Sequence, residues 1–112
     1  KTDCMDQSAI DALRDAPVVK GQLFIDGSLK DAADGGVIET VSPLNGSVLT
    51  TLAAAGSADV DRAVAAARAA YDDGRWSGLA PGTRGRILQA IGDKVAAEAL
   101  NLAVLGVRDN GT

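Results

Sequence analysis

FIDGSLKDAADGGVIETVSPLNGSVL, residues 24–49, holds short β-prone runs that are separated by turn residues. The pair Asp26-Gly27 favours a tight turn, and Pro43 followed by Asn45-Gly46 favours another. We predict strands over residues 23–25, 37–41 and 48–52, with a loop over residues 30–36. Short strands with turns at this spacing are typical of a small antiparallel β-meander.

The residues after this stretch predict helices that cover the meander. Ser57 is a favoured N-cap residue, and the apolar residues that follow recur at steps of four, three and four, as on one helical stripe. Pro81 suits the first turn of a helix. We predict helices over residues 57–73, 81–95 and 96–107.

The residues before the stretch form a polar lead. Residues 1–20 contain a weak amphipathic pattern that predicts one short helix, and Pro17 should end it because proline cannot continue the hydrogen-bond ladder. The sequence therefore divides into a lead over residues 1–22 and a folded part over residues 23–112.

The composition of the 112 residues indicates one domain or part of one. Aromatic residues make up only 3% of the chain, which is little bulk for a free-standing core. The net charge of −4 and the lack of a basic cluster argue against nucleic acid as a partner. No apolar run reaches the length of a membrane span. Because Cys4 is the single cysteine, we expect no internal disulfide and a cytoplasmic location.

The residue types that carry catalysis are few. The chain has no histidine, which excludes a Ser-His-Asp triad within it and leaves no plausible zinc site. The glycines do not form the GxGxxG pattern of a dinucleotide-binding turn. Asp72, Asp73 and Asp93 are expected on solvated helix surfaces, and Cys4 has no base beside it.

Several segments of the chain, taken together, resemble a known family. They are Leu23-Phe24-Ile25-Asp26-Gly27, Ile38-Glu39-Thr40-Val41-Ser42-Pro43, Asn45-Gly46-Ser47-Val48-Leu49, residues 58–68, Gly74-Arg75-Trp76-Ser77, Ala80-Pro81 and Asp109-Asn110-Gly111. Their order and spacing over residues 23–111 resemble the amino-terminal opening of the aldehyde dehydrogenase superfamily.

The resemblance implies an α+β fragment: a small antiparallel β-meander covered by two to three helices, forming an incomplete part of an aldehyde dehydrogenase nucleotide-binding α/β domain. It implies a parent enzyme that oxidises aldehydes to carboxylic acids with NAD or NADP. The family's cysteine nucleophile, glutamate and nucleotide loop lie beyond this sequence, so no catalytic or cofactor-binding residue is assigned here and Cys4 is not the nucleophile. The implied partners are the rest of the chain and further copies in a homo-oligomer.

One family feature carries over residue by residue. Some members hold a monovalent cation through the Thr-Val step of a strand and the aspartate of an Asp-Asn-Gly motif, and the matching positions are Thr40, Val41 and Asp109. Oxygen ligands suit a hard cation. The alternative is that Asp109 only caps a turn.

The chain also departs from the family pattern, at Leu29, Thr83, Lys94, Gly106, Arg108 and Thr112. The alternative function is therefore a truncated, non-catalytic relative that acts as a scaffold or a partner-binding module. The sequence of residues 74–88 resembles most those members that act on amino- or γ-glutamylamino-aldehydes.

Overall fold

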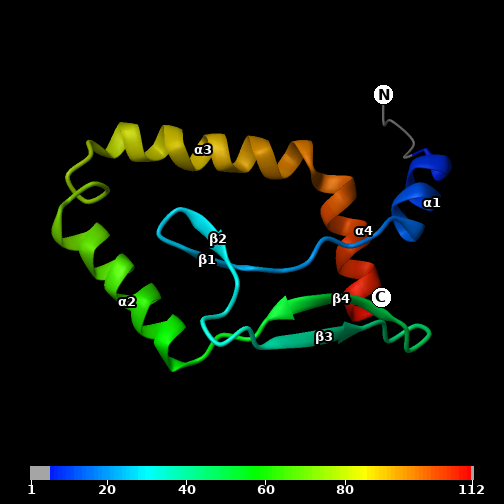
Figure 1. The fold of residues 1–112 in the computed structure, drawn as a ribbon. Coiled ribbons are helices and arrows are strands. Elements are labelled where there is room, and N and C mark those ends of the chain that lie inside the picture. Colours follow the sequence, from blue (N-terminus) through cyan, green and yellow to red (C-terminus); the bar gives the residue numbers. More distant parts are fainter. Residues whose placement is uncertain (1–5, 112) are drawn as a thin grey trace.

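The computed structural model describes residues 6–111, and these form four helices and four strands (Figure 1). In chain order they are α1 (Gln7–Asp15), β1 (Leu23–Ile25), β2 (Ser28–Lys30), β3 (Val37–Val41), β4 (Val48–Ala53), α2 (Ser57–Asp72), α3 (Pro81–Ala97) and α4 (Ala99–Asn110). The predicted α+β class, with antiparallel strands and helices, is confirmed.

The strands differ from the prediction in their pairing. They form two separate antiparallel hairpins, β1–β2 and β3–β4, instead of one continuous meander. Strand β2 lies partly in the predicted loop, where a single Leu29 between polar residues gives no β-prone run. Asp26 and Gly27 join β1 to β2 with positive φ of 51° and 74°. Positive φ at both central residues matches the twist of a tight hairpin.

The β3–β4 hairpin contains an irregularity next to Thr40. Thr40 pairs with Thr50, but the next residue, Val41, pairs with Val48. Leu49 is therefore the extra residue, as in a β-bulge. The predicted bounds of β3 agree with the structure, and β4 runs one residue further than predicted, to Ala53.

The helices lie close to their predicted positions, with two differences. Helix α4 covers Ala99–Asn110, three residues further along than the predicted 96–107, and α2 has a different cap. Helix α2 begins at Ser57, but its N-cap is Gly56. The Asp59 carboxylate accepts a hydrogen bond from the Gly56 N–H, at 3.0 Å. The prediction that Ser57 is the N-cap is therefore wrong. Helix α3 begins at Pro81 as predicted, and Glu98 separates it from α4.

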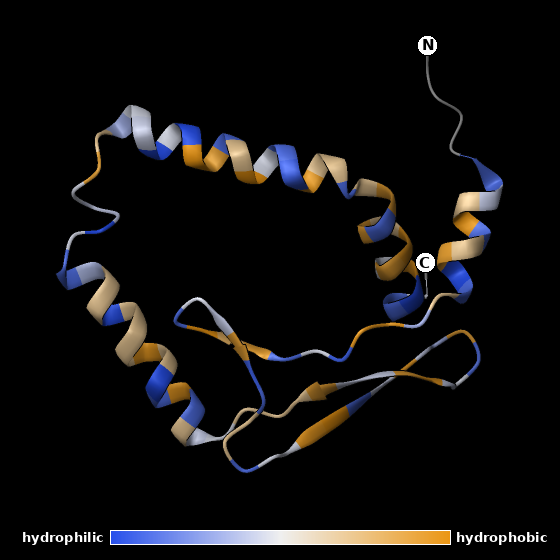
Figure 2. Ribbon diagram, turned by 45° about the horizontal axis from the view of Figure 1, so that its top comes forward, coloured by the Kyte–Doolittle hydropathy of each residue, from blue (hydrophilic) through white to orange (hydrophobic). Residues whose placement is uncertain are grey.

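The helices run beside the hairpins as an open frame and cover them only in part (Figure 1). Helix α2 packs on β1, and α1 packs on α4. Among the described hydrophobic residues, only Ile25 and Ala32 are buried. Orange hydrophobic bands recur along α2, α3 and both strands of the second hairpin (Figure 2), and many of these residues are exposed.

The overall dimensions confirm how open the chain is. The radius of gyration is 18.1 Å, against about 13 Å for a compact domain of this length. The accessible surface is 8207 Å², against about 5,700 Å² for a compact monomer of this mass. Residues 6–111 thus form elements of secondary structure with very little core between them.

Candidate functional site

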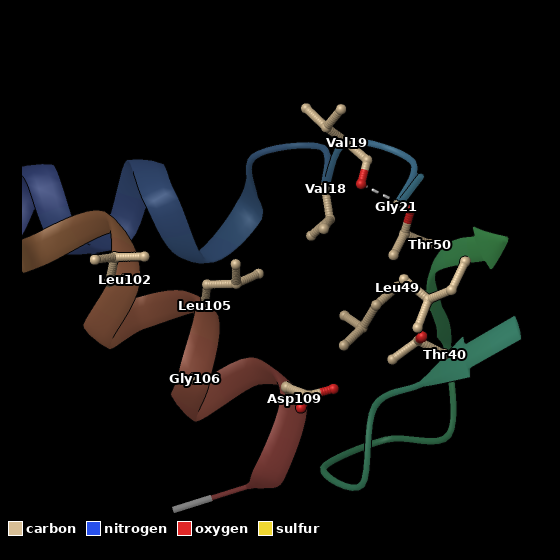
Figure 3. Close-up of a pocket in the computed structure, with 11 residues that line it drawn as sticks. Val18, Val19, Gly21, Thr40, Leu49, Thr50, Leu102, Leu105, Gly106 and Asp109 are labelled. Atoms are coloured by element: carbon tan, nitrogen blue, oxygen red, sulfur yellow. Dashed lines mark hydrogen bonds between the residues drawn. The ribbon is translucent and has the colours of Figure 1, made fainter. Parts of the chain in front are cut away.

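The pocket that contains most of the predicted site residues lies between three parts of the chain (Figure 3). One wall is the segment before β1, the second is the β3–β4 hairpin, and the third is α4. The cavity measures about 510 Å³ and its lining is mostly apolar. Its lining residues are Val18, Val19, Gly21, Thr40, Leu49, Thr50, Leu52, Leu102, Leu105, Gly106 and Asp109.

The structure brings two of the three predicted cation ligands to this pocket. Thr40 lies on the hairpin and Asp109 on the last turn of α4, and the Asp109 carboxylate projects towards the hairpin (Figure 3). Val41 is not a lining residue, and 49% of its surface is exposed. Successive side chains of a strand point to opposite faces, so the side chains of Thr40 and Val41 cannot both face the cavity.

The oxygen atoms in the pocket are of the types that bind a hard cation, because they belong to a carboxylate and to hydroxyl groups. Thr50 adds a second hydroxyl to the same lining. Among residues 6–111 there is no cluster of three or more acidic, histidine or cysteine side chains that could hold a metal ion. A cation here would therefore depend on hydroxyl and backbone oxygens beside the single Asp109 carboxylate.

In the described residues, one strand leads through a short glycine-containing turn into a helix: β4 into α2. This turn does not suit a dinucleotide. Helix N-termini attract phosphate because their N–H groups are free and the helix dipole is positive there. At α2, the Asp59 carboxylate already accepts the Gly56 N–H at 3.0 Å. Its negative charge would repel a phosphate, so this turn is a poor phosphate site.

Asp59 links α2 to the loop after β2. Its side chain is 1% exposed, and its two oxygens accept the Ala33 N–H at 3.1 and 3.2 Å. Arg62, one turn further along, donates to the same carboxylate. The Gly56 N–H, with Arg62 and the Ala33 N–H, lowers the pKa of Asp59 against the opposing effect of burial. The N-terminal position of Asp59 is visible in the sequence, but its bond to Ala33 is not.

Arg108 makes a long-range contact that the sequence does not predict. Its Nη1 donates to the carbonyl oxygens of Leu13, at 3.1 Å, and Ala16, at 2.7 Å. These carbonyls end α1, where helix carbonyls lack partners within the helix. The sequence marks Arg108 only as a departure from an apolar family position.

The remaining predicted candidates behave as surface charges or lie outside the described residues. Asp72 pairs loosely with Arg68, at 3.7 Å, and Asp93 accepts from Gln89 at 3.0 Å on an exposed face. Hydrogen bonds from Arg75 lower the pKa of Asp73, which makes Asp73 a poor proton donor. Cys4 lies outside residues 6–111.

A comparison with protein families and curated proteins gives one consistent result. Residues 30–112 match the model of the aldehyde dehydrogenase family. The chain is 37% identical over 93 residues to the NADP/NAD-dependent aldehyde dehydrogenase PuuC of Escherichia coli, covering 83% of this chain and 19% of that protein. It is 39% identical over 90 residues to the cytosolic 10-formyltetrahydrofolate dehydrogenase of Xenopus tropicalis, covering 80% of this chain and 10% of that protein.

Solved structures agree with the sequence comparison. The gamma-glutamyl-gamma-aminobutyraldehyde dehydrogenase of Burkholderia cenocepacia superposes with a TM-score of 0.85 and 36% identity, over 90% of this chain and 20% of that one. PnpE in complex with nicotinamide adenine dinucleotide superposes with a TM-score of 0.78 and 44% identity, over 83% and 19%. The chain therefore spans a fifth or less of the length of these relatives.

Proposed function

The chain belongs to the aldehyde dehydrogenase family, and from this we propose that it is the amino-terminal part of an NAD(P)-dependent enzyme that oxidises an aldehyde to a carboxylic acid. The observation that carries the proposal is the match of residues 30–112 to the family model. The agreement in fold with solved members over 80–96% of the chain supports it.

The nucleophile, the general base and the cofactor loop of the proposed enzyme belong to the rest of the polypeptide. In support, the turn from β4 to α2 is a poor phosphate site, and the acidic side chains of Asp72, Asp73 and Asp93 are exposed or bonded to arginine or glutamine. We therefore expect residues 1–112 alone to be inactive.

Support for the cofactor comes from the relatives. PnpE was solved with nicotinamide adenine dinucleotide, and PuuC carries both NADP and NAD in its name. Both nucleotides therefore belong in the assay.

The substrate proposal is an amino- or γ-glutamylamino-aldehyde, with the Burkholderia enzyme as its supporting relative. An indole-3-acetaldehyde dehydrogenase superposes equally well, with a TM-score of 0.85, so an aromatic aldehyde is the natural comparison substrate.

The proposed partner is the rest of the same polypeptide. The apolar stripes of α2 and α3 are exposed: Val64 by 62%, Leu88 by 58% and Ile91 by 54%. Exposed apolar surface on this scale marks a missing contact. The remainder of the nucleotide-binding domain would bury these stripes, and assembly of the whole enzyme into a homo-oligomer stays a prediction.

The test is NAD(P)H formation by the protein expressed from its whole reading frame, with both aldehyde classes and both nucleotides. We expect turnover by the whole protein and none by residues 1–112. Turnover by residues 1–112 that is lost in Cys4→Ala would contradict the assignment of the nucleophile to the rest of the chain. A whole protein that ends near residue 112 and is inactive would support the scaffold or partner-binding alternative.

We also propose that Thr40 and Asp109 help to hold a monovalent cation, with the backbone at Val41. The support is that Thr40 and Asp109 line one pocket although they are far apart in the sequence. In the whole protein, sodium or potassium should raise the melting temperature relative to a bulky organic cation at equal ionic strength. Asp109→Ala should remove that difference. Equal melting of the unchanged protein in all salts would leave Asp109 as a turn residue.

A further inference from the structure

The segment between α1 and β1, residues 16–21, is held at its carboxyl end by the edge of β4. Gly21 N–H donates to the Thr51 carbonyl at 2.9 Å, and Ala53 N–H donates to the Gly21 carbonyl at 2.9 Å. The Thr50 hydroxyl donates to the Val19 carbonyl at 3.2 Å. We refer to residues 16–21 as the strap.

Arg108 holds the other end of the strap. Its Nη1 donates to Leu13 and Ala16 carbonyls that are 95 and 92 residues earlier in the chain. The guanidinium is half-buried, and it meets the negative end of the α1 dipole, where a cation is stabilised. Because Pro17 follows and has no N–H, the chain turns out of α1 at the position where Arg108 binds it.

The strap is a wall of the pocket that contains Thr40 and Asp109. Val18 is half-buried and points towards Leu105 and Leu49 (Figure 3). A second cavity of about 430 Å³ lies between the strap and α4, and Val18, Leu105 and Arg108 all line it. The strap therefore separates the two cavities, with Arg108 at its root.

We propose that Arg108 is a positioning residue that fixes the strap across the pocket of Thr40 and Asp109, so that the pocket keeps the wall formed by the strap only while Arg108 caps α1. Without the guanidinium, the Leu13 and Ala16 carbonyls lose their donor, α1 detaches from α4, and the strap stays attached only at β4. This inference needs no cation in the pocket, so it is independent of the cation proposal above.

Amide hydrogen exchange on the whole protein tests this proposal. In Arg108→Met, which keeps the bulk of the side chain and removes its donors, exchange over residues 7–18 should be faster by about tenfold or more, as expected when hydrogen bonds to a charged group are lost. Exchange in the β3–β4 hairpin should stay unchanged. Arg108→Lys keeps the positive charge and should restore part of the protection.

Arg86→Met is the matched control, because Arg86 is exposed on α3 and bonds only to the Thr83 hydroxyl at 3.2 Å among the described residues. It should leave residues 7–18 unchanged. If Arg108→Met does not fold, Arg108→Leu, which also has no side-chain donor, carries the same prediction. Unchanged exchange over residues 7–18, or equal acceleration over the whole chain, would overturn the proposal.

Discussion

Asp59 joins two parts of the chain that are 26 residues apart, through a carboxylate that is 1% exposed. Its acceptors are filled by two backbone N–H groups and Arg62. An ionised carboxylate accepts such bonds more strongly than a neutral amide does. Asp59 therefore sets where α2 begins relative to the loop after β2.

Asp59→Asn should lower the melting temperature of the whole protein, since Asn cannot form the ion pair with Arg62. The pKa of Asp59 is lowered on folding, so its stabilising effect is present above the unfolded pKa of about 3.9 and is lost as the pH falls through the folded pKa. The difference in melting temperature between Asp59→Asn and the unchanged protein should be constant near neutral pH and shrink below about pH 4. Asp61→Asn, at an exposed position on the same helix, is the control. A difference that persists at low pH would show that ionisation of Asp59 is not the cause.

Gly111 ends α4 in a left-handed conformation, with φ of 78°, and its N–H donates to the Val107 carbonyl at 2.8 Å. A Cβ at this position would also lie 3.0 Å from Pro43 Cγ. Gly111→Ala should therefore destabilise the protein by more than about 1 kcal/mol. Gly27→Ala, with φ of 74° but open space around it, should cost less. Chemical denaturation of both variants would measure this, and equal losses would show that the turn at Pro43 does not press on α4.

At the scale of elements, α3 has one polar face and one apolar face. Gln89 donates to Asp93 at 3.0 Å on its exposed polar side, while Ile87, Leu88, Ile91 and Val95 form its apolar stripe. A helix with one apolar face is stabilised mainly when that face packs against another element.

Ile91→Ala should destabilise the whole protein by about 2–5 kcal/mol, the loss typical of a buried aliphatic side chain. The same change in residues 1–112 alone should have little effect, because Ile91 is 54% exposed there. Gln89→Ala, on the opposite side of α3, should stay within about 0.5 kcal/mol in the whole protein. Denaturation midpoints of the variants measure these differences. A loss below that of Gln89→Ala would show that the remainder of the enzyme does not cover this stripe.

The elements show which features can be predicted from sequence. Pro81 and the Asp26-Gly27 pair act locally, so the start of α3 and the first hairpin turn are predictable. Strand β2 is not predictable from its own residues, because it is a strand only through its pairing with β1. Asp59 and Arg108 bond to backbone groups far along the chain. Such groups become available only once the fold has formed, so spacing in the sequence cannot reveal them.

At the scale of the whole molecule, the described residues form secondary structure with very little core. Its radius of gyration of 18.1 Å and its two buried hydrophobic residues among those described leave little burial to offset the loss of chain entropy, which amounts to about 1–2 kcal/mol per residue for the backbone. The aligned part of the chain covers only 19% and 20% of two family relatives, and we attribute the missing burial to further residues of a similarly long protein.

The most direct test of this view is amide hydrogen exchange on residues 1–112 alone, compared with the same residues in the whole protein. We predict rapid exchange in the isolated chain, with self-association through its apolar stripes visible by sedimentation, and slow exchange of α2, α3 and both hairpins in the whole protein. A monomer of residues 1–112 with slow-exchanging amides from Leu23 to Leu105 would contradict it. That result would identify an autonomous domain and favour the partner-binding alternative.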